Sequence, residues 1–263
     1  MGKWPLGLIV PVQHPTPFSL FLPDRWEEAL SQIAKAGYNT VELAVTDPSG
    51  ITQERTAEAL NRNDLRLSSI TTGQAALLEG LSLSSSNETI RHQTVDRIQA
   101  HMRLAQPFGA VVIVGSLQGS SGDIPKLVKS LKECASYDRE VRLAFEPLNR
   151  YESSLVNTTS EALSIVDRVG EENLGLTLDT FHANIEELSI DEAIRKIDDR
   201  LFHVHLADSN RWVPGYGHLD FTPIWKALVE VGYSGSLVIE SFPRPSSEAL
   251  LTAARQIRTQ WIS

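Results

Sequence analysis

Eight short apolar runs rich in β-branched residues alternate with longer stretches of helical periodicity along the whole chain. The short runs predict strands and the longer stretches predict amphipathic helices. The expected strands are residues 6–12, 40–45, 65–72, 110–115, 141–147, 174–180, 201–207 and 236–242. The expected helices include residues 23–30, 87–108, 121–137, 159–169, 190–197, 222–231 and 246–261. A chain with this order of elements favours an α/β fold with a parallel sheet.

Eight strand–helix units in 263 residues, with no Pro- or Ser-rich linker, indicate a single (β/α)8 barrel domain spanning residues 1–263. An open doubly wound sheet is the alternative, but no Gly-rich dinucleotide or phosphate motif follows the first strand. The connection at residues 73–86 is longer than usual, and we expect it to cover the barrel mouth.

Composition and charge exclude several classes of function. The chain has 24 Lys and Arg against 33 Asp and Glu, a formal net charge of −9, and no basic cluster, which argues against nucleic acid as a partner. One cysteine, Cys134, cannot form an intramolecular disulfide. No apolar run is long enough to span a bilayer, and the amino terminus lacks a signal-peptide pattern, so we expect no membrane association and a cytoplasmic protein.

Four ionisable residues stand where the last four predicted strands end, namely Glu146, Asp179, His205 and Glu240. The carboxyl ends of barrel strands meet at one rim, and alternation sends every second side chain inward, so these four side chains are expected to converge. Three converging carboxylates repel one another unless a cation compensates them. Oxygen-rich ligation with one imidazole favours Mn²⁺, with Mg²⁺ or Co²⁺ as alternatives.

Other polar residues near these strand ends allow simpler interpretations. His203 lies one layer below His205 and is expected to be a buried, hydrogen-bonded histidine. His182 is expected on a loop above the barrel, where it either faces the solvent or contacts a substrate. Arg150 and Arg211 present planar guanidinium groups that suit a substrate carboxylate, unless they bind hydroxyls or pair with Asp208.

Segments 145–152, 178–182, 203–211 and 238–240 resemble the sugar isomerase/epimerase superfamily of xylose-isomerase-like TIM barrels. The spacings of 33, 26 and 35 residues between the four ligands are similar to those of the ketose 3-epimerases within it. A narrower likeness to the 5-keto-L-gluconate epimerase branch comes from segments 44–49, 72–83 and 207–215. Two positions depart from the ketose epimerase pattern, Thr71 in place of glycine and Ser241 in place of proline.

The resemblance implies residue roles. Glu146, Asp179, His205 and Glu240 would bind one divalent metal ion, and Glu146 and Glu240 would also be the acid/base pair. Substrate oxygens would be held by Glu152, His182 and Arg211.

The implied activity is epimerisation of the hydroxyl carbon beside the ketone of a keto sugar acid, through an enediolate. The alternative is a ketose 3-epimerase, or an aldose/ketose isomerase of the hydroxypyruvate or inosose type, acting on a neutral or phosphorylated sugar. A non-catalytic sugar-binding protein is a remote alternative. An abasic-site endonuclease of this fold would need a histidine-rich zinc cluster, and the third and fourth strands end without histidine. Association into homo-oligomers stays open.

Overall fold

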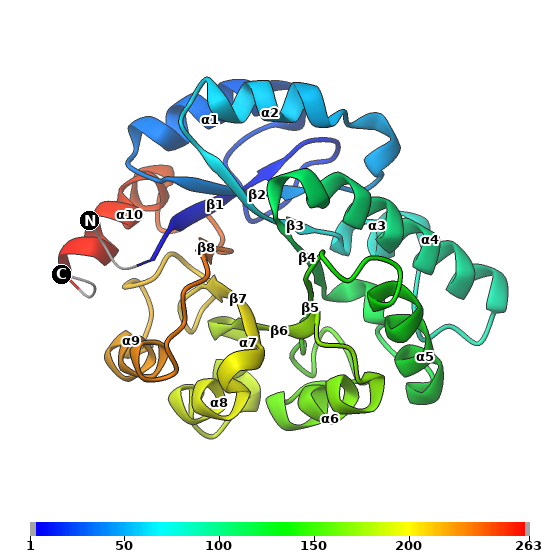
Figure 1. Ribbon diagram of the computed structural model, residues 1–263. Helices are drawn as coiled ribbons and strands as arrows, with labels where there is room; N and C mark the ends of the chain where they lie inside the picture. The colour runs from blue at the N-terminus through cyan, green and yellow to red at the C-terminus, as the bar shows by residue number, and fades with distance from the viewer. Residues whose placement is uncertain (1–3, 261–263) are drawn as a thin grey trace.

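The computed structural model describes residues 4–260. Eight parallel strands close into a barrel in chain order, with β8 pairing to β1, and the helices surround this ring (Figure 1). The strands are β1 Leu6–Pro11, β2 Thr40–Ala44, β3 Arg66–Thr71, β4 Val111–Val114, β5 Leu143–Phe145, β6 Leu174–Asp179, β7 Leu201–Leu206 and β8 Leu237–Ile239. The predicted (β/α)8 barrel is confirmed.

The α-helices are α1 Trp26–Lys35, α2 Gln53–Asn61, α3 Gly73–Glu79, α4 Glu88–Ala105, α5 Ile124–Ala135, α6 Thr159–Val169, α7 Thr180–Glu186, α8 Ile190–Ile197, α9 Phe221–Glu230 and α10 Ser247–Gln260. Short 3-10 helices are η1 Pro23–Arg25, η2 Pro48–Gly50, η3 Gln106–Phe108, η4 Ser116–Gln118 and η5 Asp198–Arg200. Each predicted strand and helix has a counterpart, with ends that differ by a few residues. Residue 261, the predicted end of the last helix, lies outside the described residues.

Three helices were not predicted: α2, α3 and α7. The α3 and α7 helices have seven residues each, too few for a helical period to stand out against the neighbouring strand. The barrel accommodates both at the carboxyl ends of its strands, α3 after β3 and α7 directly after β6. Connections at this rim carry the functional groups in folds of this kind.

The large hydrophobic core joins buried strand residues to buried residues of the surrounding helices. A separate small apolar cluster, Ile9, Ala44 and Val238, comes from β1, β2 and β8. Other strand residues are polar, and Asp179 pairs in register with His205 and Thr177 with His203. Within residues 4–260, no helix combines the length and apolar character needed to cross a membrane. That residues 1–263 form one domain stays a prediction, because the described part stops short of both ends.

Candidate metal centre

The four predicted ligands come together at the carboxyl rim of the barrel. Glu146 directly follows β5, Asp179 ends β6, His205 lies in β7 and Glu240 directly follows β8. All four are buried, and each offers an atom within 4.8 Å of those of the others. They converge because the carboxyl ends of parallel strands meet at one rim of a closed barrel. Three carboxylates and one imidazole form a donor set that suits a divalent cation of the Mn²⁺ or Mg²⁺ type.

His205 lies at the middle of this cluster. Its Nδ1 is 3.1 Å from Oε1 of Glu146 and 3.2 Å from Oε2 of Glu240. Burial alone would lower the pKa of His205, but the carboxylates of Glu42 and Glu240 raise it well above its usual value. The surrounding carboxylates therefore favour a positive charge at this position.

Asp179 provides a test of whether a cation fits. Its Oδ1 accepts hydrogen bonds from the backbone N–H of Phe181 at 2.6 Å and of His182 at 3.4 Å. Its Oδ2 is buried and accepts no hydrogen bond from any described residue. Buried carboxylate oxygens are normally satisfied, so an oxygen left open toward three other candidate ligands fits metal coordination.

Burial and charge shift the pKa values of two carboxyl groups in opposite directions. Burial raises the pKa of Asp179 to about 7, assisted by the neighbouring Glu240 and Glu146 carboxylates and opposed by His182. Burial would also raise the pKa of Glu240, but His205 and Arg211 lower it to about 2. Burial therefore favours the protonated form of Asp179, whereas His205 and Arg211 favour the ionised form of Glu240.

Gly115 makes room for the Glu146 side chain. It follows β4, the strand next to β5, and a Cβ atom built there would lie 2.5 Å from Oε2 of Glu146. Cβ atoms do not approach other heavy atoms so closely, so any larger residue would push the carboxylate away. The sequence pattern predicts Gly115 only as the end of a strand.

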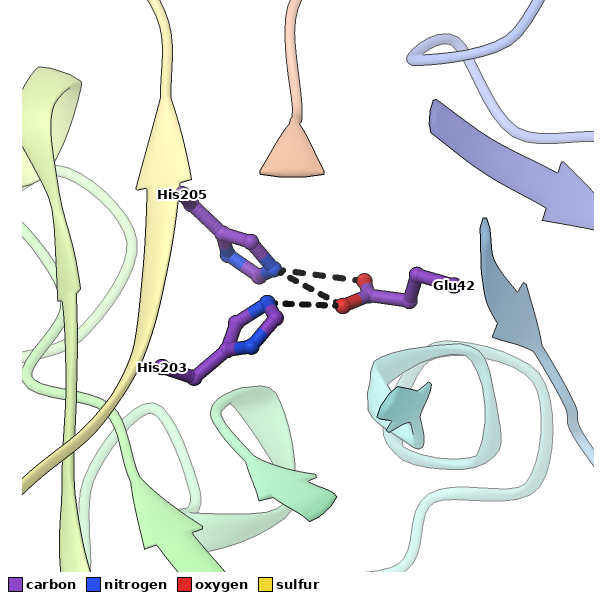
Figure 2. Close-up of side chains that lie close together, drawn as sticks. All are labelled: Glu42, His203 and His205. Carbon is purple, nitrogen blue, oxygen red and sulfur yellow. Dashed lines mark hydrogen bonds and ion pairs between the residues drawn. The ribbon is translucent and has the colours of Figure 1, made fainter. Parts of the chain in front are cut away.

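Glu42 is a buried carboxylate that the sequence analysis missed. It lies within β2 and is fully buried (Figure 2). Burial would raise its pKa, but His205 and His203 hold that pKa well below the usual range for glutamate. The sequence does contain a sign of this residue, because a charged residue within a predicted apolar strand is rare unless its charge is paired. His203 is buried and contacts Glu42 at 3.2 Å, as expected of a hydrogen-bonded core histidine.

A cavity of about 1040 Å³ adjoins the candidate metal ligands. It reaches Glu146 and Glu240 at its base and is lined by the predicted substrate-contact residues Glu152, His182 and Arg211. The connection at 73–86 forms part of its wall, which agrees with the expected cover of the barrel mouth. A second cavity, of about 800 Å³, lies at the opposite end of the strands and contains none of the four candidate ligands.

Arg211 is held rigidly at the edge of this cavity. Its Nη1 donates to Oε1 of Glu152 at 2.7 Å, and its guanidinium carbon lies 4.3 Å from the ring centre of Phe18 and 4.8 Å from that of Phe181. Such stacking suits the flat guanidinium group. The backbone of Arg211 has a φ of 60°, a left-handed conformation that disfavours residues with a side chain. The two phenylalanines were not predicted as part of the site.

His182 was expected on a loop, and this expectation was wrong. It lies in α7, one turn after Asp179, and is buried. Its Nδ1 accepts a hydrogen bond from the side-chain amide of Asn149 at 2.7 Å, and the same amide donates to Glu152 at 2.9 Å. Asn149 therefore connects two of the three predicted substrate-contact residues.

Arg150 does not reach the cavity. It forms an ion pair with Glu186 at 2.8 Å on the surface, where 60% of its side chain is exposed. Asp208 pairs with neither arginine, because it accepts hydrogen bonds from the backbone N–H groups of Ser209, Gly215 and Leu219. Of the two arginines, only Arg211 lines the cavity.

Comparison with known proteins places this architecture among sugar epimerases. A D-psicose 3-epimerase of Enterocloster bolteae is 45% identical over 123 residues, which are 46% of this chain and 41% of that protein. An L-ribulose 3-epimerase of Mesorhizobium japonicum is 30% identical over 231 residues, which are 82% of this chain and 75% of that protein. A solved structure of L-ribulose 3-epimerase superposes with a TM-score of 0.78 at 27% identity, covering 98% of this chain and 88% of that one.

These relatives bear on two predictions. They are named sugar epimerases, which are isomerases, so the predicted enzyme class is confirmed. They act on ketoses by name, and so support the ketose 3-epimerase alternative over the keto sugar acid.

The family model described as "Xylose isomerase-like TIM barrel" matches residues 30–260. The chain belongs to the family of xylose isomerase-like TIM barrels and has ketose 3-epimerases among its homologues.

Proposed function

We propose that this protein is a divalent-metal-dependent ketose epimerase that inverts the hydroxyl carbon beside the ketone of a neutral sugar. The observation that carries the proposal is the convergence of Glu146, Asp179, His205 and Glu240 at the base of a sugar-sized cavity. The relatives named ketose 3-epimerases support it.

The four converging residues are the ligands in this proposal, with Mn²⁺ as the expected ion because carboxylate oxygens dominate the donor set. When bound, a divalent cation supplies Lewis-acid polarisation of the ketone, which acidifies the neighbouring C–H bond. Asp179 and His205 contribute only as ligands. Their hydrogen bonds to backbone N–H groups and to Glu42 keep them in place.

Glu146 and Glu240 are the proposed acid/base pair. They come from β5 and β8, which are separated in the barrel by β6 and β7, so their carboxylates approach the cavity base from different sides. One carboxylate removes the proton from the carbon that carries the hydroxyl group. The other returns a proton to the opposite face, and the configuration is inverted.

Glu152, His182 and Arg211 are the proposed contacts for the substrate hydroxyl groups. Among the described residues that line the cavity, Arg211 is the one Arg or Lys, and Glu152 already neutralises it. A substrate carboxylate would therefore find no free cationic side chain, whereas sugar hydroxyls can donate to Glu152 and accept from Arg211. This charge pattern favours a neutral ketose over 5-keto-L-gluconate or D-tagaturonate.

The test is proton exchange at the substrate carbon. Protein loaded with Mn²⁺ is incubated in D₂O with neutral ketoses, keto sugar acids and ketose phosphates in parallel, and deuterium uptake and products are followed by NMR. We expect exchange with inversion on neutral ketoses. Inversion only on the sugar acids would restore the keto-acid assignment, and aldose products would assign an isomerase. Metal and sugar binding without exchange on any sugar would indicate a binding protein.

A further inference from the structure

Glu42 lies on the opposite side of the barrel interior from the strand that carries His205. Figure 2 shows His203 and His205 reaching from β7 toward this one carboxylate on β2. Nε2 of His205 lies 3.2 Å from Oε1 and 3.1 Å from Oε2, and Nε2 of His203 lies 3.2 Å from Oε2. The hydroxyl of Ser69 donates to Oε2 at 2.6 Å. Glu42 is thereby surrounded by donors.

A buried carboxylate is costly unless hydrogen bonds satisfy it, and the Glu42 carboxylate has Ser69, His203 and His205 as its partners. An ionised carboxylate only accepts hydrogen bonds, so it selects the form of His205 that carries a proton on Nε2. The remaining nitrogen, Nδ1, then faces Glu146 and Glu240 at 3.1 and 3.2 Å. In metal sites, such outer partners fix the tautomer and the ring orientation of a histidine ligand.

We propose that Glu42 is a positioning residue, held by Ser69 and His203, which keeps the proton on Nε2 of His205 and leaves Nδ1 free to bind the metal. The inference rests on the metal centre of the proposed function. It extends that centre to three side chains that do not line the large cavity and that come from β2, β3 and β7.

A second metal ion is the competing interpretation, because Glu42, His203 and His205 also lie within 4.8 Å of one another. The geometry favours hydrogen bonding. Each of the three side chains already has a hydrogen-bond partner within the group, so an ion bound among them would have to replace these hydrogen bonds. The two interpretations differ in stoichiometry, one ion per chain or two.

The experiment replaces Glu42 with an isosteric amide. In Glu42→Gln an amide N–H₂ group replaces one carboxylate oxygen and faces the hydrogen-bond donors around it. The side chain at position 42 then no longer requires His205 to carry its proton on Nε2. We expect the metal-free variant to bind Mn²⁺ roughly 10- to 100-fold more weakly than the wild type, as measured by competition with a chelating dye. Nitrogen-15 NMR of the histidine rings, with Mg²⁺ as the diamagnetic ion, should show a fixed Nε2–H tautomer of His205 only in the wild type.

Thr177→Val is the matched control. Thr177 is buried and pairs in register with His203, yet its hydroxyl has no hydrogen-bond partner among the described residues. The control should keep the wild-type metal affinity and tautomer. Ser69→Ala removes a single hydrogen bond to Glu42, should weaken Mn²⁺ binding less than Glu42→Gln does, and serves if the glutamine variant fails to fold.

Three outcomes would overturn the inference. Wild-type affinity with an unchanged tautomer in Glu42→Gln and Ser69→Ala would show that Glu42 does not position His205. Two ions bound per wild-type chain, falling to one in Glu42→Gln, would assign the second metal site instead. A wild type that binds no metal would remove the metal centre altogether. Tight metal binding without epimerisation would contradict only the proposed activity.

Discussion

The guanidinium group of Arg211 donates to the Glu152 carboxylate at 2.7 Å while it lies between the rings of Phe18 and Phe181. Its Nε is buried and has no hydrogen-bond acceptor among the described residues. A stacked guanidinium that lines the cavity is preorganised to bind an oxygen of the substrate. This arrangement makes Arg211 the substrate contact whose replacement is most informative.

Arg211→Lys should lower kcat/KM for the preferred ketose by roughly 10- to 100-fold, because a lysine keeps the charge but loses the planar fork and the stacking. Steady-state kinetics at saturating Mn²⁺ measure the effect. Arg150→Lys is the control, since the Arg150 ion pair with Glu186 lies on the surface. Equal losses in both variants would contradict a specific role for Arg211.

Gly115→Ala should weaken Mn²⁺ binding by about tenfold or more, because the added Cβ would occupy the place of Oε2 of Glu146. Calorimetric titration of the metal-free protein measures the affinity. In the control, Gly50→Ala, the nearest atom to the added Cβ is a side-chain nitrogen of Gln13 at 3.4 Å. A Gly115→Ala protein with wild-type affinity would show that Glu146 can bind metal from another position.

Metal affinity should rise as the pH increases through about 7. Asp179, with its pKa raised to about 7, and His205, whose pKa is also raised, both hold protons in the metal-free protein that the cation must displace. Each displaced proton contributes up to about tenfold in affinity per pH unit below the pKa of its group. Calorimetric titrations with the metal ion in buffers of different ionisation enthalpy count the protons that binding releases. Zero proton release at pH 6 would contradict the raised pKa values.

Glu146→Gln and Glu240→Gln should each lower kcat by roughly 10²- to 10⁴-fold, because each removes one of the two groups that transfer protons. Both residues are also proposed ligands, so metal content must be measured in the same samples. Exchange of the substrate C–H proton without inversion in one variant would identify which carboxylate removes the proton from which face. Full turnover in either variant with metal bound would end the two-base mechanism.

The barrel and the four candidate ligands were predictable from local patterns. Glu146 and Glu240 directly follow apolar strands and Asp179 ends one. His205 is the last residue but one of β7. In a closed parallel barrel the carboxyl ends of the strands share one rim. The position of each residue along its own strand therefore predicts that the four side chains converge.

The partners of those ligands were not predictable in this way. Glu42 and His205 are 163 residues apart, and nothing in either segment indicates that β2 and β7 face each other across the interior. The stacking of Phe18 on Arg211, and the surface pairing of Arg150 in place of a cavity contact, likewise depend on how loops fold over the rim.

Periodicity along a strand is a local property of the backbone, and it determines which residues turn inward and where each strand ends. Contacts across the interior arise only when the barrel closes and its side chains pack to high density. The sequence therefore identifies the candidate ligands of the metal centre. The closed barrel determines which buried groups orient these side chains and which arginine side chain lines the cavity.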